Sequence, residues 1–218
     1  MAVIHRQHAK APTPPLFGRS EEQRLLKTAL QAAIDGRGGL VVLGGEAGIG
    51  KTALARDLAA TASANDVLVL SGHSYDLTNT PPYGLWLDLT STYRPSGAVP
   101  APPNAFATGQ IDKIASQVAL FSETRAFFAA LSATRPVLLV LEDCHWADPA
   151  SLELLRFLGP SLAARRLLLV ATYRSDELTR QHPFYRQLPS LVREADGHRI
   201  DLRRLDASSL RALIDSKV

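Results

Sequence analysis

The sequence predicts an α/β fold in which a parallel β-sheet is covered by helices on both faces. Short runs rich in valine and leucine alternate along the chain with longer segments of helical periodicity. Strands that are apolar on both sides are typical of a sheet buried between helices, and the alternation favours parallel connections. The chain has 218 residues, of which 46% are apolar and 21% charged, enough for one such domain.

The first helix is expected at 20–36. Its apolar residues recur three and four positions apart, Ser20 and Gln23 have the spacing of a capping box, and Gly36 is a stop signal. The preceding residues, 1–15, are polar and contain proline, and we expect them to form a mobile arm before a single domain at 16–218.

Five strands are expected, four of them strongly apolar, at 39–44, 66–72, 136–143, 166–174 and, more weakly, 198–205. In a parallel sheet, ligands bind outside the carboxyl ends of the strands. The loops that follow residues 43, 72, 142 and 172 are therefore the places where a site is expected.

Further helices are expected at 51–64, 81–93, 111–131 and 148–159. Asp148 followed by Pro149 is a typical N-cap and first turn. The helix at 111–131 carries apolar residues at helical spacing, Val118 among them, so it is expected to be amphipathic. Residues 95–109 are rich in Pro, Ala and Gly and are expected to form a loop.

A glycine-rich loop joins the strand at 39–44 to the helix at 51–64 and fits the phosphate-binding pattern G-x-x-x-x-G-K-[ST]. Glycines let successive backbone N–H groups point at phosphate oxygens, and the helix start adds partial positive charge. Lys51 would neutralise the β- and γ-phosphates, and the Thr52 hydroxyl would bind Mg²⁺. The expected phosphate-contacting residues are Gly45, Glu46, Ala47, Gly48, Ile49, Gly50, Lys51 and Thr52. The alternative is a glycine-rich turn, and the strand before it and the helix after it favour phosphate binding.

Two acids, Glu142 and Asp143, end the strand at 136–143. After a phosphate-binding loop, one acid should hold Mg²⁺ and the other should orient or deprotonate the attacking water. By register, Glu142 takes the metal role and Asp143 the base role. A Glu is one methylene longer than the usual Asp, so the assignment stays open between them. The alternative is a pair of solvated acids at a strand end.

Three further groups of polar residues follow the strands. Thr172 and Arg174 end the strand at 166–174, and either could contact the γ-phosphate, the arginine through charge-assisted hydrogen bonds; a surface turn is the alternative for Arg174. Cys144, His145 and Asp148 lie beside the acids, where local structural roles are favoured over a metal or nucleophile cluster. For His73, a local hydrogen bond is favoured over catalysis.

Four segments together resemble the STAND signal-transduction ATPases of the AAA+ class, namely LFGRSEEQRLL, GGEAGIGKTALARDLA, PVLLVLEDCHWADPASLELLRFL and RLLLVATYRSDEL. More narrowly, they resemble the N-terminal ATPase region of large LuxR-type (MalT-like) transcriptional regulators, and similar modules follow class III nucleotidyl cyclase domains. The resemblance runs from residue 16 to residue 214.

The resemblance implies a P-loop NTPase fold, a three-layer α/β/α sandwich with strand order 5-1-4-3-2. It implies that Phe17, Gly18 and Arg19 lie along the adenine of ATP or ADP, and that Arg174 is a sensor of the γ-phosphate. The residues it makes catalytic are Lys51, Glu142, Asp143 and Arg174, and those it makes ligands of Mg²⁺ are Thr52, Glu142 and Asp143.

The family continues into a winged-helix lid and later domains, whereas this chain stops at Val218. We therefore expect a fragment without a lid or a DNA-binding element. The expected partners are a nucleotide and either a second copy or downstream regulator domains, with no membrane. A single cysteine, no apolar stretch of ~20 residues and no secretory signal favour the cytoplasm. The net charge of +3 is scattered, which disfavours nucleic-acid binding.

The leading functional prediction is an ATP- and Mg²⁺-binding switch module with slow hydrolysis, from a LuxR-type regulator. Three alternatives stay open. The first is the ATPase module of a cyclase-linked signalling protein. The second is a P-loop kinase for a small molecule, and the third is a truncated scaffold that binds nucleotide weakly.

Overall fold

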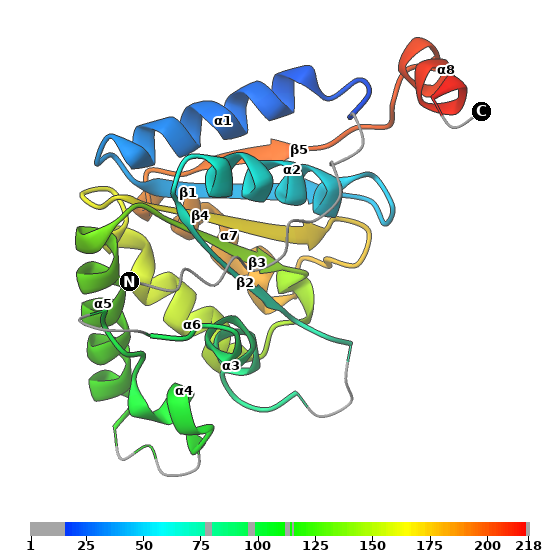
Figure 1. The fold of residues 1–218 in the computed structure, drawn as a ribbon. Helices are drawn as coiled ribbons and strands as arrows, with labels where there is room; N and C mark the ends of the chain where they lie inside the picture. Colours follow the sequence, from blue (N-terminus) through cyan, green and yellow to red (C-terminus); the bar gives the residue numbers. More distant parts are fainter. Residues whose placement is uncertain (1–15, 77–79, 96–98, 112–113, 115, 217–218) are drawn as a thin grey trace.

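The computed structural model describes residues 16–76, 80–95, 99–111, 114 and 116–216, so the arm expected at 1–15 lies outside the described residues. The strands are β1 (Gly39–Gly45), β2 (Leu68–His73), β3 (Val137–Glu142), β4 (Leu167–Arg174) and β5 (His198–Asp201). All neighbours pair in parallel, in the spatial order β2-β3-β4-β1-β5 (Figure 1). This is the expected order 5-1-4-3-2 read from the other edge, so the predicted fold is confirmed.

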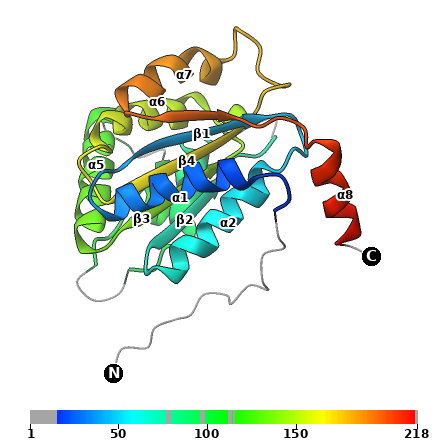
Figure 2. The same cartoon turned by 90° about the horizontal axis from the view of Figure 1, so that it is seen from above.

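The helices of the described residues form the outer layers. They are α1 (Ser20–Ile34), α2 (Lys51–Ala64), α3 (Gly84–Ser91), α4 (Asn104–Thr108), α5 (Gln117–Thr134), α6 (Pro149–Leu158), α7 (Pro183–Glu194) and α8 (Ala207–Asp215), with 3₁₀ turns at Cys144–Trp146 and Gly159–Ser161. In the view from above, α1 and α2 lie on one side of the sheet, and α5, α6 and α7 lie on the other (Figure 2). No helix in the described part of the chain is long and apolar enough to cross a membrane.

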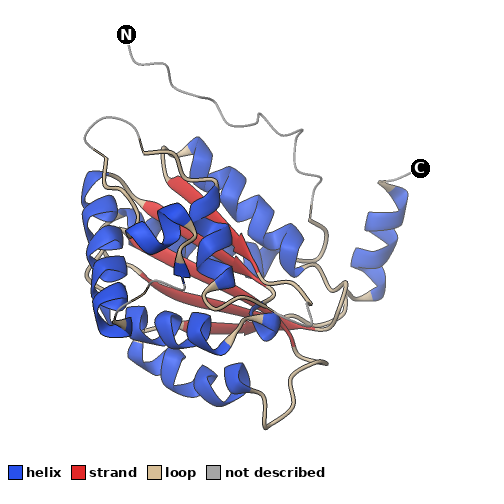
Figure 3. Ribbon diagram, turned by 90° about the horizontal axis from the view of Figure 1, so that it is seen from below, coloured by secondary structure: helices blue, strands red, loops and turns tan. Residues whose placement is uncertain are grey.

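Each face of the sheet contributes to a separate apolar core. Leu138 and Val140 of β3 pack with Leu54 and Leu58 of α2, whereas Leu141 belongs to the core on the opposite face. Successive strand residues point to opposite faces, which explains the division. The strands therefore lie between two helical layers, as the secondary-structure colouring also shows (Figure 3).

Several local expectations were wrong. Ser20 is the first residue of α1 and makes no cap; the N-cap is Arg19, without a side-chain bond, and Gln23 donates to Asp57 instead. Gly36 does end this helix, at φ 90°. The expected helix at 111–131 begins only at Gln117, because the hydroxyl of Ser116 caps it.

Other differences come from tertiary packing. Val118 is 74% exposed, so it lies off the buried face of α5, and the loop expected at 95–109 contains α4. The strand expected at 66–72 is an edge strand, only half-buried. The sequence analysis missed α7, whose internal Pro189 argues against a helix, and α8, in which no residue is buried. In all three views α8 projects from one end of the domain.

Asp148 is the N-cap of α6, as predicted, and it also fixes the start of α3. Its carboxylate is buried and accepts from the backbone N–H groups of Ser151 (2.9 Å), Tyr83 (2.9 Å) and Gly84 (3.2 Å). We expect Asp148→Ala to lower the free energy of unfolding by about 2–4 kcal/mol, because it removes a cap and leaves buried donors unpaired. Urea unfolding measures the change.

Asp206 provides the matched control. It caps α8 by accepting from the N–H of Ser209 (2.7 Å) but is exposed. Asp206→Ala should therefore have a clearly smaller effect on the same unfolding curve. Equal losses for the two variants would contradict the role given to Asp148.

Candidate functional site

The glycine-rich loop joins β1 to α2. Gly45, Gly48 and Gly50 have φ values of 155°, 72° and 109°, in the left-handed region. A Cβ at Gly48 or Gly50 would meet no protein atom within 4 Å, so the backbone conformation and not packing requires glycine there. Other residues pay about 1–2 kcal/mol for this conformation. The loop has the curled backbone that the phosphate-binding pattern requires.

Lys51 is the first residue of α2 and is 7% exposed. Its ammonium donates to the carbonyls of Gly45 and Glu46, both at 2.8 Å. Burial lowers the pKa of Lys51, and the nearby carboxylate of Asp143 acts in the opposite direction. The N-cap of α2, Gly50, supplies no side-chain acceptor. The helix start therefore presents backbone donors and one partly desolvated cation, which is the chemistry of an anion site.

The two acids at the carboxyl end of β3 have different surroundings. Glu142 is 6% exposed and lies on the same side of β3 as Val140, the side that packs against α2. Its Oε1 lies 3.1 Å from Nε2 of His73, and Nδ1 of His73 lies 3.3 Å from Oδ2 of Asp88. Glu142 is thus the end of a chain of polar groups that runs to α3, and it is not a freely solvated acid.

Asp143 leaves the strand with a left-handed backbone, at φ 56°. Its N–H donates to the hydroxyl of Thr172 (3.0 Å), which is 1% exposed, and Asp143 Oδ1 lies 3.9 Å from Nδ1 of His145. The Asp143 carboxylate acts against the fall in the pKa of Lys51 that burial causes. The Thr172 hydroxyl holds the backbone of Asp143 at this strand end.

Arg174 ends β4 directly opposite Gly45 in the register of β1 with β4. Its Nη1 donates to Oε1 of Glu177 at 2.6 Å, and its guanidinium carbon lies 4.5 Å from the centre of the Trp146 ring. The pair with Glu177 raises the pKa of Arg174. Arg174 is not a free arginine in a surface turn, because the carboxylate of Glu177 and the indole of Trp146 both contact its side chain.

Cys144 and His145, which follow the two acids, are buried side chains. Cys144 is completely buried, and burial raises the pKa of its thiol, which argues against a nucleophile. His145 is buried as well, and its Nδ1 accepts from the N–H of Arg174 (3.4 Å). Burial lowers the pKa of His145. Among the described residues, no group of three His, Cys, Asp or Glu side chains is arranged to hold a metal by itself.

The segment before α1 lies beside the loop. Arg19 is 6% exposed, and its Nη2 donates to the carbonyls of Ile49 (3.0 Å) and Arg203 (2.7 Å). A Cβ on Gly18 would lie 2.4 Å from the Ser209 hydroxyl. Phe17 is half-buried. These contacts tie the segment, the loop and the chain after β5 together; the contact of Phe17, Gly18 and Arg19 with adenine stays a prediction.

Two exposed residues of the loop have no buried partner. Ala47 is exposed, and Glu46 forms an exposed ion pair at 2.8 Å with Arg204, which follows β5.

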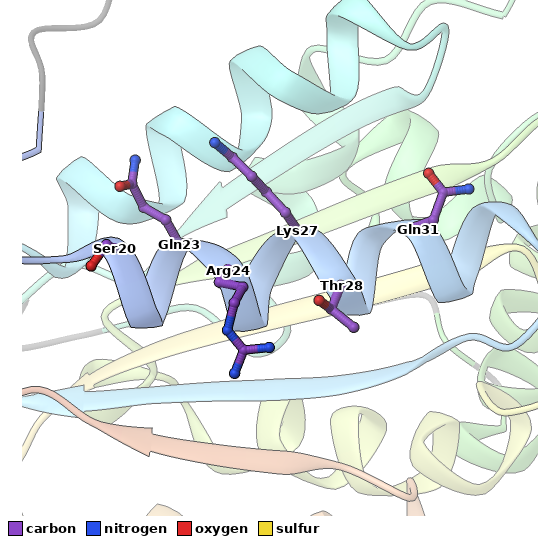
Figure 4. Close-up of a pocket in the computed structure, with 6 residues that line it drawn as sticks. All are labelled: Ser20, Gln23, Arg24, Lys27, Thr28 and Gln31. Carbon is purple, nitrogen blue, oxygen red and sulfur yellow. The ribbon is translucent and has the colours of Figure 1, made fainter.

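A separate hollow lies on the outer face of α1 (Figure 4). It is lined by Ser20, Gln23, Arg24, Lys27, Thr28 and Gln31, all from one helix, so no second element converges on it.

Sequence analysis assigned no functional role to three residues near the site, namely Asp88, Trp146 and Glu177. Asp88 lies in α3, and no local pattern relates it to a strand end. Glu177 lies three residues after Arg174, and this charge spacing was a usable signal. The ring of Trp146 lies under the Arg174 guanidinium, a contact for which the sequence carries no local signal.

We expect Thr172→Val to lower the free energy of unfolding by about 1–3 kcal/mol, because it leaves the N–H of Asp143 without its acceptor. Thr172→Ser keeps the hydroxyl and should lose less. Denaturant unfolding of both variants measures the difference. A valine variant as stable as the serine variant would show that the Thr172–Asp143 bond does not hold the acid.

Several solved protein structures superpose on this chain. The solved structure of Cdc6p from Pyrobaculum aerophilum superposes with a TM-score of 0.64 at 14% identity, over 97% of this chain and 52% of that one. Drosophila ORC bound to DNA gives 0.55 at 16% identity, over 96% and 47%. AMPPCP-bound DnaA from Aquifex aeolicus gives 0.51 at 15% identity, over 92% and 50%. The chain therefore spans about half the length of these proteins.

At such identities the likeness establishes the fold alone. A comparison with curated protein sequences finds no match. The family model described as the AAA ATPase domain matches residues 15–170, most of the chain, and includes the glycine-rich loop and the two acids at the end of β3. The chain belongs to the AAA ATPase domain family.

Proposed function

We propose that this chain is an ATP- and Mg²⁺-binding AAA+ module that acts as a nucleotide-dependent switch with slow hydrolysis. One observation carries the proposal: the glycine-rich loop with Lys51 follows β1, and Asp143 and Arg174 lie at the carboxyl ends of the neighbouring strands β3 and β4, at the same edge of the sheet. A cation for phosphate, an acid for water or metal, and an arginine for the γ-phosphate are the groups that nucleotide hydrolysis requires. The AMPPCP bound to the similar DnaA structure supports a nucleoside triphosphate as ligand.

The residues present fit this ligand. The left-handed glycines and the open start of α2 provide backbone donors for the phosphates, and Lys51 provides the charge. Thr52 and Glu142 are proposed to hold Mg²⁺, since Glu142 lies on the face of β3 that packs against α2. When bound, Mg²⁺ neutralises charge on the phosphate oxygens. Asp143, which is 29% exposed at its side chain, is proposed to orient the attacking water.

The finer assignment rests on the four sequence segments. We propose the STAND subclass and, within it, the ATPase region of a LuxR-type transcriptional regulator, with a cyclase-linked module as the second candidate. The partners proposed are a second copy of the chain or downstream regulator domains. The Drosophila ORC structure contains DNA, whereas the scattered charge of this chain favours no DNA contact of its own.

We expect Lys51→Ala to weaken binding of fluorescent ATP and ADP analogues by roughly 10- to 100-fold, the value of one charge-assisted hydrogen-bonding group. Lys27→Ala is the matched control, because it removes the same charge from the exposed face of α1. Titrations with and without Mg²⁺ measure both. If the Lys51 variant binds the nucleotide analogues as tightly as the wild-type chain does, the proposal is wrong. If the folded wild-type chain binds neither analogue, a scaffold role is favoured.

The roles of Glu142 and Asp143 can be distinguished by replacing each acid with its amide. We expect Asp143→Asn to keep Mg²⁺-dependent ATP binding and to lose at least about 100-fold in hydrolysis, the lower end of the range for general-base catalysis. Glu142→Gln should instead reduce the effect of Mg²⁺ on ATP affinity. Single-turnover hydrolysis and Mg²⁺ titrations distinguish them, and the opposite pattern would exchange the two roles.

A further inference from the structure

Arg174 is held by groups of the protein itself. Its Nη1 donates to Oε1 of Glu177 at 2.6 Å, and its guanidinium carbon lies 4.5 Å from the centre of the Trp146 ring. The side chains of the ion pair are 30% and 35% exposed, so the contact is partly shielded from water. An arginine in this position is already satisfied by an anion before any nucleotide is considered.

The carboxylate of Glu177 also lies near the buried His145, although Nε2 of that ring has no hydrogen-bond partner among the described residues. Its Oε2 lies 3.3 Å from Nε2 of the buried His145, whose other ring nitrogen accepts from the N–H of Arg174. The carboxylate of Glu177 acts against the fall in the pKa of Lys51 that burial causes. The Arg174 guanidinium is therefore paired with a carboxylate at the edge of the sheet where the glycine-rich loop begins.

We propose that Glu177 is a specificity-determining residue, which makes the site distinguish ATP from ADP by competing with the terminal phosphate for Arg174. This inference rests on the proposed function. In this proposal the γ-phosphate replaces the Glu177 carboxylate at Nη1 of the guanidinium, whereas ADP leaves that bond intact. The free energy of the Arg174–Glu177 pair is then subtracted from ATP binding alone.

The test is the ATP and ADP affinity of Glu177→Gln. Ion pairs of this exposure are worth up to about 1 kcal/mol, so we expect ATP to bind about two- to fivefold more tightly, with ADP affinity unchanged. Asp176→Asn is the matched control, because it removes the same charge one residue away and Asp176 makes no ion pair among the described residues. Any long-range charge effect appears in both variants and is subtracted.

The coupling to Arg174 is tested by a double-mutant cycle. In an Arg174→Gln background, Glu177→Gln should no longer change the ratio of ATP to ADP affinity, because the contested group is absent. Trp146 supplies an independent signal, since the only other tryptophan, Trp86, is completely buried in the core. ATP should change the emission of Trp146 as the guanidinium leaves the ring, ADP should not, and Trp146→Phe should remove the difference.

The outcomes separate this inference from the proposed function. If wild-type chain binds both nucleotides and Glu177→Gln changes their affinities equally or not at all, the competition is refuted and nucleotide binding stands. Weaker ATP binding in Glu177→Gln would mean that Glu177 holds Arg174 ready for the phosphate, which also overturns it. If the folded wild-type chain binds neither nucleotide, both proposals fail together.

Discussion

The parallel pairing of β1 with β4 is the constraint on which the candidate site depends. Their register sets Gly45, at the start of the glycine-rich loop, beside Arg174, and the N–H of Ser175 donates to the Gly45 carbonyl at 3.2 Å. Both strands are buried between helical layers, so a shift of one residue would send apolar side chains to the wrong core. The register that buries the core therefore also fixes the distance between the loop and the arginine.

Two basic side chains, Lys51 and Arg174, lie near this pairing, at an edge of the sheet that is partly shielded from water. Lys51 is almost completely buried and is satisfied by loop carbonyls, while Arg174 is satisfied by Glu177. Burial makes each of these electrostatic contacts stronger than it would be in water, and it makes an unpaired charge costly. A ligand that enters this edge must replace contacts that the protein already makes.

The segment before α1 and the segment after β5 are tied to the same edge. The N–H of Leu202 donates to the Gly44 carbonyl at 2.8 Å, and Arg19 joins the carbonyl of Ile49 to that of Arg203. The segment before α1 and the segment after β5 therefore meet at the loop, although they lie at opposite ends of the sequence. A buried guanidinium therefore links both segments to the backbone of Ile49.

The sequence by itself determined the five strands, the helix after the loop and the residues at the strand ends, because periodicity, glycines and motif spacing are local signals. It did not determine which polar groups pair. The contact of His73 with Glu142 spans 69 residues and that of Arg19 with Arg203 spans 184. Such partners depend on strand register and layer packing, for which no short stretch of sequence carries a signal. Only the tertiary structure decided that Glu142 contacts a histidine, the Asp143 backbone a threonine hydroxyl, and Arg174 a carboxylate.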